Sequence, residues 1–540
     1  MRAAVRSYGS LLLALSVCFF ISGCSPSDMA TDRDGRMLII GASEEPQTLD
    51  PHYGLFGQIQ QAVLPLVFEP LFFRDVDAKT ILPRLATSYT AHDAQTFEIM
   101  LRKGVTFSDG TPFDGEDVVF SFKRLANPPG ASIPIKYIAD VIDHIEILDP
   151  HRVMFHLSTP TPGFIGYLIE APILSSGIGG AGPADFNALT AAIGTGPYRI
   201  ESWSRGDNIA YRPNDRYWGA QAEWDEITLK FLPNHAARIA ALLSGDIDVT
   251  NYIPTADIER LNRDPDVGVV ARHSNRPIYF HLDVERPVTP FITDKSGAPI
   301  PNPLRDKRVR EALSIALDRD LIVEKLLGGY ATPAFQWMAA GHLGHNADLS
   351  EYPYDRDRAR ALLTDAGYAD GFSLTLHGTA GLYGPDVRLL QAMASMWAKI
   401  GLDVTVEALP PSIYWDPWYR REFSVALSSY GFHPHRIIPV LNGTITSSGH
   451  QNIGGYKNEI VDRLLSAAQA APLEAQQALM AEVSAHVHSD IGLLVLYHIQ
   501  YVFAYRTNHL TYDPTENLRD LEPLRAFPVS ATASSTGDAG

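Results

Sequence analysis

The stretch from Phe372 to Val406 reads FSLTLHGTAGLYGPDVRLLQAMASMWAKIGLDVTV and contains two hydrophobic patterns. Apolar residues first alternate with polar ones, as in a half-buried strand. Residues 385–400 then show helical spacing, and Val404 belongs to a second alternating run. A strand, a helix and a strand in this order predict an α/β layer with largely parallel strands.

The segments around this stretch extend the alternation of helices and strands. Asp355 or Asp357 can begin a helix. In residues 305–327 the apolar side chains recur at three- and four-residue steps, which predicts one amphipathic helix that Gly328 and Gly329 end. Further strands are predicted over 37–41, 97–101 and 153–157, and further helices over 459–471 and 474–488.

The composition is that of an ordinary globular protein. The chain has 540 residues, of which 45% are hydrophobic and 20% charged, so it is neither a collagen nor a coiled-coil rod nor a disordered chain. Its length predicts three or four domains. Its formal charge is 44 − 62 = −18, and because an acidic protein repels a phosphate backbone, nucleic acid is not an expected partner.

The N-terminus has the pattern of an exported protein. Arg2 and Arg6 precede an apolar run over 11–21 that is too short to span a bilayer, and we interpret residues 1–23 as a signal peptide. The four residues that end at Cys24, ISGC, resemble the bacterial lipobox, which implies that the thiol of Cys24 accepts diacylglycerol before cleavage. The alternative is a plain signal segment with a buried cysteine.

Only two cysteines occur, Cys18 and Cys24. One lies in the expected signal peptide and the other is the expected lipidation site, so the mature protein is predicted to have no disulfide, no cysteine nucleophile and no cysteine-ligated metal. Residues 24–36 suit a lipid-anchored tether, and residues 529–540 a disordered tail. We therefore expect a protein in the periplasmic space or at the cell surface, anchored to a membrane by its N-terminal lipid.

Several motifs follow one another along most of the chain. They are EPQTLDP at 45–51, FEPL at 68–71, LPRLA at 82–86, LRKGVTFSDGTP at 101–112, GTGPY at 194–198, NDRYW at 214–218, SGDID at 244–248 and DKRVREAL at 306–313. In kind and order they resemble the extracellular solute-binding proteins of the oligopeptide, dipeptide and nickel class (family 5), the substrate-capturing subunits of ABC importers. For most of these motifs we prefer a structural role, as tight turns or close backbone approaches, so they mark the fold rather than the site.

The resemblance implies an α/β fold with two lobes, the periplasmic-binding-protein fold of type II, cluster C, with an inserted extra domain and a hinge between the lobes. The implied ranges are 37–70, 194–283 and 499–528 for lobe I, 71–193 for the inserted domain and 284–498 for lobe II. Closure about the hinge would enclose the ligand. The resemblance also implies ABC permease and ATPase subunits as partners, and we expect a monomer without a cofactor.

The implied ligand site departs from the pattern of peptide-binding relatives. In those relatives an Asp that follows an aromatic residue pairs with the α-ammonium group of the ligand. Here Tyr430 stands at the aromatic position and His433 where the Asp is expected. An imidazole supplies no fixed negative charge, so either the amine is anchored elsewhere or the ligand is acidic, blocked or not a peptide. The two imidazoles of His433 and His435 also favour a second hypothesis, the binding of nickel or a metal chelate. The simpler alternative is a solvent-facing loop.

Aromatic side chains are concentrated before and within this stretch. Flat rings accept varied ligand groups, although the same residues also suit a core between the lobes. The predicted ligand-binding residues are Glu45, Pro46 and Gln47 on the opposite lobe, Tyr137 in the inserted domain, and Trp415, Trp418, Tyr430, Phe432 and His433.

Common catalytic motifs are missing from the sequence. It has no HExxH zinc pair, no GxSxG elbow and no GxxxxGK phosphate loop. GIGGAG at 177–182 matches the dinucleotide pattern, but Pro183 follows it, so we interpret it as a flexible loop. We predict no catalytic residue, and a binding protein that captures a peptide or peptide-like solute and delivers it to a permease. An exported hydrolase and a ligand sensor remain alternatives.

Overall fold

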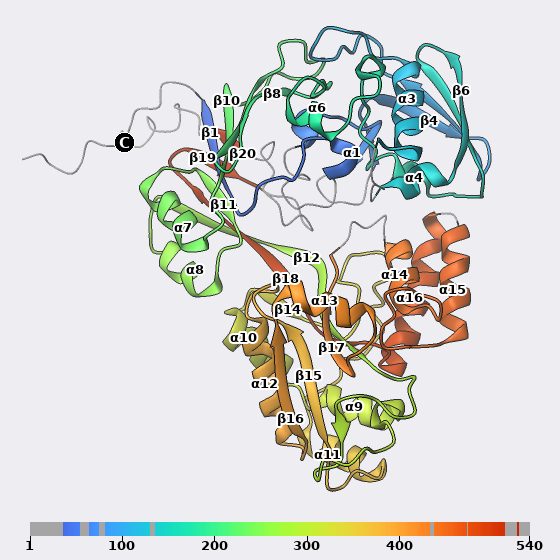
Figure 1. Ribbon diagram of the computed structural model, residues 1–540, viewed down its shortest axis with the longest axis vertical. Helices are drawn as coiled ribbons and strands as arrows, with labels where there is room; N and C mark the ends of the chain where they lie inside the picture. Colours follow the sequence, from blue (N-terminus) through green and yellow to red (C-terminus); the bar gives the residue numbers. More distant parts are fainter. Residues whose placement is uncertain are drawn as a thin grey trace, which may run out of the picture. The chain divides into compact units, whose positions relative to one another are not determined.

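The computed structural model describes residues 36–54, 64–74, 81–129, 135–431, 437–471, 473–513 and 526–528. The expected signal peptide, Cys24 and the expected tail after 528 lie outside this part of the chain. The largest feature of the described part is a sheet of twelve strands in the order β13-β15-β17-β12-β18-β11-β1-β10-β9-β8, with β14 added to β18 and β16 to β15 (Figure 1). The strands are β1 (Met37–Ala42), β8 (Tyr198–Ser204), β9 (Asn208–Pro213), β10 (Glu226–Phe231), β11 (Val249–Asn251), β12 (Val267–Leu282), β13 (Ile292–Thr293), β14 (Ala331–Pro333), β15 (Ser373–Thr379), β16 (Asp403–Leu409), β17 (Val425–Ser429) and β18 (Leu494–Arg506).

Two long antiparallel strands, β12 and β18, join the two halves of this sheet. On one side β18 pairs with β11, which leads to β1 and β10. On the other side β12 pairs with β17, which leads to β15. In Figure 1 both strands run between the group around β1 and the group around β15. Any movement of one half relative to the other must therefore bend or twist β12 and β18.

The half that contains β1 has its own core. Leu38 and Ile40 are buried at alternate positions of β1, which confirms the strand predicted over 37–41. Ile239 of α7 and Ile258 of α8 belong to a second buried cluster with residues of β18. The two helices are α7 (His235–Ser244) and α8 (Thr255–Leu261).

The half that contains β15 confirms the predicted alternation of strands and helices. β15 and β16 are parallel neighbours, and the helix between them buries Leu389, Leu390 and Trp397. The side chain of Asp355 accepts a hydrogen bond from the Arg358 N–H and caps the start of the helix over Arg356–Asp365, so the first of the two predicted start residues is correct. Because β12, β13 and β18 run antiparallel to their neighbours, the sheet as a whole is mixed rather than largely parallel. The helices are α11 (Arg356–Asp365) and α12 (Asp386–Ala398).

The single helix predicted over 305–327 is wrong. The segment forms two helices, α9 (Lys307–Ile315) and α10 (Arg319–Leu327). The side chain of Asp318 accepts a hydrogen bond from an N–H in the first turn of α10. Such a cap satisfies a backbone donor that a helix start otherwise leaves unpaired, so the Asp favours a new helix over continuation of the old one. Gly328 ends α10 with a φ of 57°, as predicted.

A separate four-stranded sheet precedes β8 in the sequence. Its strands β4 (Ala86–Ala91), β5 (Thr96–Leu101), β6 (Ile142–Asp149) and β7 (Arg152–Leu157) follow the order β4-β5-β7-β6. Phe97, Ile99, Val153 and Phe155 are buried, which confirms the strands predicted over these residues. They form one hydrophobic cluster with α3 and α4, distinct from the clusters of the large sheet. The other elements of this region are α3 (Gly115–Ala126), α4 (Lys136–Asp140), α5 (Phe164–Tyr167), α6 (Pro183–Asn187), β2 (Phe72–Arg74) and β3 (Ile81–Pro83).

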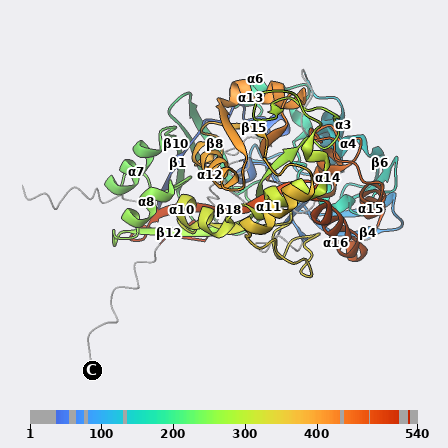
Figure 2. The same ribbon diagram turned by 90° about the horizontal axis from the view of Figure 1, so that it is seen from below.

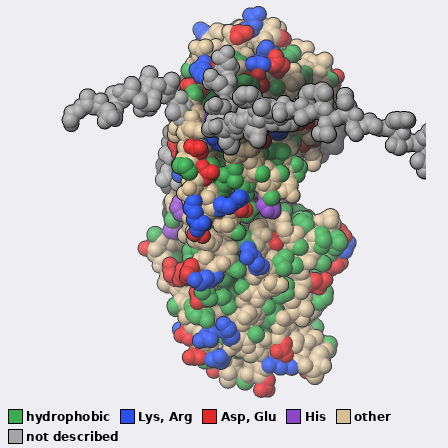
Figure 3. Space-filling view, turned by 90° about the vertical axis from the view of Figure 1, so that its left-hand side faces the viewer, with side chains coloured by type: hydrophobic (Ala, Val, Ile, Leu, Met, Phe, Trp, Pro, Cys, Tyr) green, Lys and Arg blue, Asp and Glu red, His purple; other side chains and the backbone are tan. Residues whose placement is uncertain are grey.

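Helices α14, α15 and α16 pack together around Leu441, Val461 and Val483 and lie side by side in both views (Figure 2). Among the described residues, no helix is long and apolar enough to cross a membrane. On the face seen in Figure 3, acidic and basic side chains are interspersed. The remaining elements are α1 (Pro51–Gly54), α13 (Pro411–Tyr419), α14 (Ile437–Ile445), α15 (Glu459–Ala470), α16 (Leu473–Asp490), β19 (Leu510–Tyr512) and β20 (Ala526–Pro528).

Candidate functional site

Strand β12 is irregular where it passes between the halves of the sheet. Its pairing with β18 is continuous up to His273, opposite Gln500, and resumes at Pro277, opposite His498. Three residues of β12 therefore face one residue of β18, and the hydroxyl of Ser274 donates to the carbonyl of that residue at 2.6 Å. A bulge of this kind bends a strand and changes the direction of its side chains, and bulges are frequent beside binding sites.

Arg276 is the last residue of this bulge and is half-buried. Its Nε donates to Oγ of Ser429 at 3.0 Å, and its guanidinium carbon lies 5.7 Å from the ring centroid of Tyr383. The backbone of Gly431 lies against it, since a Cβ at that glycine would come within 3.0 Å of Nη1. A hydrogen bond also joins the guanidinium to Tyr501 of β18. Arg276 thus contacts segments from both sides of the junction.

No carboxylate among the described residues balances the charge of Arg276. In the described ranges, no ion pair includes this residue, and its partners are hydroxyl groups and aromatic rings. Burial lowers the pKa of Arg276, neighbouring tyrosines raise it, and the net direction is upward, so the guanidinium stays charged. The tyrosines that raise it are Tyr501, Tyr383 and Tyr252.

The segment that carries Tyr383 is held by a buried carboxylate. Asp386 is 2% exposed and accepts hydrogen bonds from the hydroxyl of Thr379 and from the N–H groups of Gly381, Leu382 and Tyr383. Several donors on one carboxylate fix the loop between β15 and α12. The ring beside Arg276 is therefore attached to a rigid part of the fold.

The first group of predicted site residues follows β1. Glu45 accepts hydrogen bonds from the indole N–H of Trp203 at 3.0 Å and from the N–H of Gly206 at 3.1 Å, so it holds the β8–β9 hairpin. Pro46 is buried and Gln47 is exposed. The carboxylate of Glu45 is thus engaged within its own half of the sheet.

The predicted aromatic residues occupy three different environments. Trp415 and Trp418 of α13 contact each other with centroids 5.5 Å apart, and Trp418 is 3% exposed in a cluster with Tyr414. Tyr430 packs at the edge of the cluster around α14 and α16. Tyr137, by contrast, lies in the separate sheet region, where its hydroxyl donates to Glu170.

The remaining predicted residues, Phe432, His433 and His435, lie outside the described residues, as does the lipidation site Cys24. Within the ranges that the structure does describe, no group of three or more His, Cys, Asp or Glu side chains is arranged to hold a metal ion. The amine-anchor position and the metal alternative therefore stay predictions.

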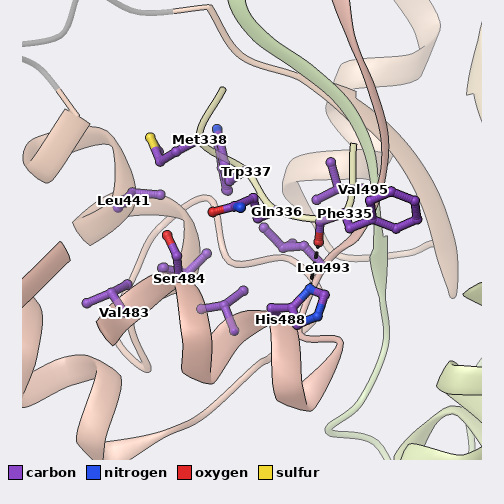
Figure 4. A pocket seen from close by; sticks show the side chains of 12 residues that line it. Phe335, Gln336, Trp337, Met338, Leu441, Val483, Ser484, His488, Leu493 and Val495 are labelled. Atoms are coloured by element: carbon purple, nitrogen blue, oxygen red, sulfur yellow. Dashed lines mark hydrogen bonds between the residues drawn. The ribbon is translucent and has the colours of Figure 1, made fainter. Parts of the chain in front are cut away.

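A small pocket lies in the half that contains β15, between the Phe335–Met338 segment and helices α14 and α16 (Figure 4). Its enclosed volume of about 20 Å³ holds roughly one water molecule. Its polar groups are already engaged: Nδ1 of His488 is hydrogen-bonded to the Phe335 carbonyl at 3.0 Å, and Ser484 donates to Gly344 at 2.6 Å. This pocket is too small for a solute of peptide size.

Several of the sequence motifs meet at one buried carboxylate. Glu69 of FEPL is 1% exposed, forms an ion pair with Arg84 of LPRLA, and accepts a hydrogen bond at 2.8 Å from the indole N–H of Trp218 of NDRYW. Burial raises the pKa of Glu69, while Arg84 and Trp218 act in the opposite direction. The guanidinium of Arg102, from LRKG, lies 4.2 Å from the Trp218 ring centroid. These contacts agree with a structural role for the motifs.

The sequence patterns do not single out Arg276, Ser429, Tyr383 or Tyr501. One signal was available: Arg272 to Arg276 is a polar interruption between two largely apolar runs, and Pro277, which cannot donate to a sheet ladder, follows it. The partners of Arg276 come from segments more than 100 residues away, which no local pattern reveals.

Comparisons with known proteins identify relatives of the whole fold. Residues 80–451 match the family model of bacterial extracellular solute-binding proteins, family 5 (middle). The chain is 26% identical to the dipeptide-binding protein of Escherichia coli K12 over 75% of this chain and 76% of that protein. It is 30% identical to the glutathione-binding protein GsiB of Salmonella paratyphi A over 69% of each chain.

Among solved structures, the ABC transporter substrate-binding protein CtaP of Listeria monocytogenes is similar in fold. The TM-score is 0.79 at 22% identity, and the match covers 92% of this chain and 100% of that chain. The fold is therefore the two-lobed α/β fold of type II binding proteins, as the motifs implied.

Proposed function

The chain belongs to the bacterial extracellular solute-binding proteins of family 5, and from this premise we propose that it captures a peptide or peptide-like solute between two closing lobes and delivers it to the permease of an ABC importer. Its relatives include a dipeptide-binding and a glutathione-binding protein, which favours a small solute with peptide bonds. No covalent step is required of the protein.

The observation that carries the proposal is the pair of strands that both halves of the sheet share. β12 pairs with β17 at one end and with β18 along its length, and β18 continues to β11. Two connecting strands permit a hinge motion while keeping both lobes intact. A solute that contacts both lobes favours the closed form by its differential affinity, and a micromolar solute supplies about −8 kcal/mol for contact and closure together.

The proposed lobes correspond in outline to separate hydrophobic cores. Lobe I comprises 37–70, 194–283 and 499–528, the inserted domain 71–193 and lobe II 284–498. Separate buried clusters around β1, around β5 and around β15 support a division into three parts. The clusters cross two of the bounds, since Phe280 packs in the cluster around β15 and Phe186 in the cluster around β1.

A peptide mixture tests the proposal. Purified protein is incubated with defined di- and tripeptides, and its unfolding temperature and the recovered peptides are measured. Binding without turnover raises the unfolding temperature by mass action and returns every peptide intact. Cleaved peptides would favour the hydrolase alternative, and a protein whose stability no peptide changes would exclude peptide capture.

We also propose that Cys24 anchors the protein to a membrane through lipid, with the body outside the cytoplasm. The ISGC sequence after the apolar run supports lipidation, and the extracellular character of the family supports export. In the native host, Cys24→Ser is expected to move the protein from the membrane fraction to the soluble fraction. If the variant stays membrane-bound, the anchor lies elsewhere.

The place of His433 in the ligand site is a third part of the proposal. If this residue occupies the amine-anchor position, His433→Asp is expected to strengthen the binding of peptides with a free N-terminus, because a carboxylate pairs with an ammonium group. N-acetylated peptides are the control, since they have no ammonium group. Equal affinity of the variant and the wild type for free peptides would reject the assignment.

A further inference from the structure

We propose that Arg276 binds a carboxylate group of the solute, so that the protein selects solutes with an exposed carboxylate. This inference rests on the proposed function, because it names the class of solute that the same site takes. It concerns a residue that neither the motifs nor the sequence pattern brought forward.

The first step is the set of groups that surround the charge of Arg276. An arginine side chain has five N–H donors and no acceptor, and it remains charged at physiological pH. Other shielded arginines are satisfied in one of two ways: Arg124 and Arg84 pair with the carboxylates of Asp50 and Glu69, and Arg319 donates to several backbone carbonyls. Arg276 instead bonds to the hydroxyl groups of Ser429 and Tyr501, and no carboxylate of the described residues pairs with it.

The second step is the position of Arg276 in the fold. It ends the bulge of β12, where the strand passes from one half of the sheet to the other. Ser429 belongs to β17 and Tyr383 follows β15 on one side, whereas Tyr501 belongs to β18. A group bound to Arg276 therefore lies where closure of the lobes acts, and its binding energy can favour the closed form.

The third step is the free energy that closure of the lobes costs when it removes the charge of Arg276 from water. Removing a guanidinium from water without a counter-charge is unfavourable, and a carboxylate in bidentate contact offsets that cost. A neutral solute leaves the charge without a partner. Arg276 thus favours acidic solutes and disfavours neutral ones. The specificity comes in part from the unfavourable free energy of burying the charge beside a neutral solute.

A carboxylate can come from the C-terminus of a peptide or from a side chain, and the experiment separates these sources. The probes are Ala-X-Ala tripeptides, with X any amino acid, prepared as free acids, as N-acetylated acids and as C-terminal amides. Native mass spectrometry of the purified full chain identifies the bound peptides, and calorimetry measures the affinity of the tightest one. If the C-terminus is the source, both acid sets bind and the amides do not. If a side chain is the source, peptides of all three sets bind when X is Asp or Glu and do not bind otherwise.

The variants are Arg276→Met, which removes the charge, and Arg276→Lys, which keeps the charge but not the planar fork. The matched control is Arg263→Met, because Arg263 is exposed just beyond α8 and pairs with Glu259. Arg276→Met is expected to weaken the binding of acids roughly 10- to 100-fold, as for the loss of a charged hydrogen bond. Arg276→Lys is expected to give a smaller loss, and Arg263→Met none. If Arg276→Met does not fold, the loss in Arg276→Lys for acids alone serves as the test.

Two results would overturn the inference. If neutral amides bind as tightly as acids, or if Arg276→Met keeps full affinity, Arg276 has only a structural role, although solute capture itself stands. If no peptide binds, the peptide proposal fails, and the simple dicarboxylates glutarate and 2-oxoglutarate become the probes. If either compound stabilises the wild type but not Arg276→Met, the carboxylate inference holds for a solute that is not a peptide. If neither compound stabilises the wild type, the carboxylate inference is rejected together with the peptide proposal.

Discussion

His281 lies on β12 with its ring between two other aromatic residues. It is 2% exposed, its centroid lies 5.5 Å from that of Trp418 and 5.3 Å from that of Tyr279, and its Nε2 has no hydrogen-bond partner among the described residues. Burial lowers the pKa of His281 to about 3. In the unfolded chain the imidazole takes up a proton below pH 6.5, whereas in the folded protein it does not until about pH 3.

We therefore expect His281 to make the protein less stable as the pH falls from 7 to 5. Above pH 6.5 the imidazole is neutral in both the folded and the unfolded state, so it costs no stability. At pH 5 it lowers the free energy of unfolding by about 2 kcal/mol, since each pKa unit corresponds to about 1.4 kcal/mol. His281→Phe is expected to remove this part of the pH dependence, measured by urea unfolding at both pH values. The control is His235→Phe, at an exposed position at the start of α7. An unchanged difference between pH 7 and pH 5 would show that His281 titrates normally in the folded protein.

Glu69 gives a second prediction for a single side chain. Its ion-pair partner Arg84 is partly exposed, whereas the carboxylate itself is buried. Arg84→Met leaves that charge uncompensated, and we expect a loss of about 3–5 kcal/mol in the free energy of unfolding at pH 7.5. Because burial raises the pKa of Glu69, the loss is expected to shrink at pH 5 as the carboxyl group takes up a proton. Arg152→Met, at an exposed surface pair, is the control and is expected to change stability by less than about 1 kcal/mol.

Close contact between two chain segments decides the role of the GTGPY motif. A Cβ at Gly194 would lie 2.0 Å from the carbonyl oxygen of Val67, and the N–H of Gly196 donates to that oxygen at 2.9 Å. Gly194→Ala must therefore separate two backbone segments, and we expect a loss of about 2–3 kcal/mol in the free energy of unfolding. Gly180→Ala is the matched control, since nothing lies within 4 Å of its added Cβ. Equal unfolding midpoints for the two variants would contradict this structural role.

Local patterns predicted single elements well where the chain forms them on its own. The strand of β1, the alternation in β5 and β7, and the start of α11 at Asp355 follow from periodicity and capping, which are properties of neighbouring residues. The break between α9 and α10 was missed, because apolar spacing continues across Asp318 while the capping hydrogen bond stops the helix. Competition between a cap and a continuing helix is decided by the tertiary position of the segment.

The pairing of distant strands could not be predicted from the residues themselves. β1 lies between β10 and β11, and β18 joins β11 to β12, so the large sheet is assembled from segments hundreds of residues apart. The two-lobed fold was inferred from the motifs as a set rather than from any strand. Arg276 was missed for the same reason, since its environment is made by Ser429, Tyr383 and Tyr501 together.

Closure of the whole molecule is the final prediction. Only closure brings the solute into contact with both lobes, so a bound solute must stabilise the folded protein and reduce its radius of gyration at the same time. At a solute concentration of 100 times Kd, the free energy of unfolding is expected to rise by about 2.7 kcal/mol. Small-angle X-ray scattering of the same sample is expected to show a smaller radius of gyration, and a solute that does not bind provides the control. A stability gain without compaction would mean that the solute binds one lobe alone, and the shared strands β12 and β18 would then have no role as a hinge.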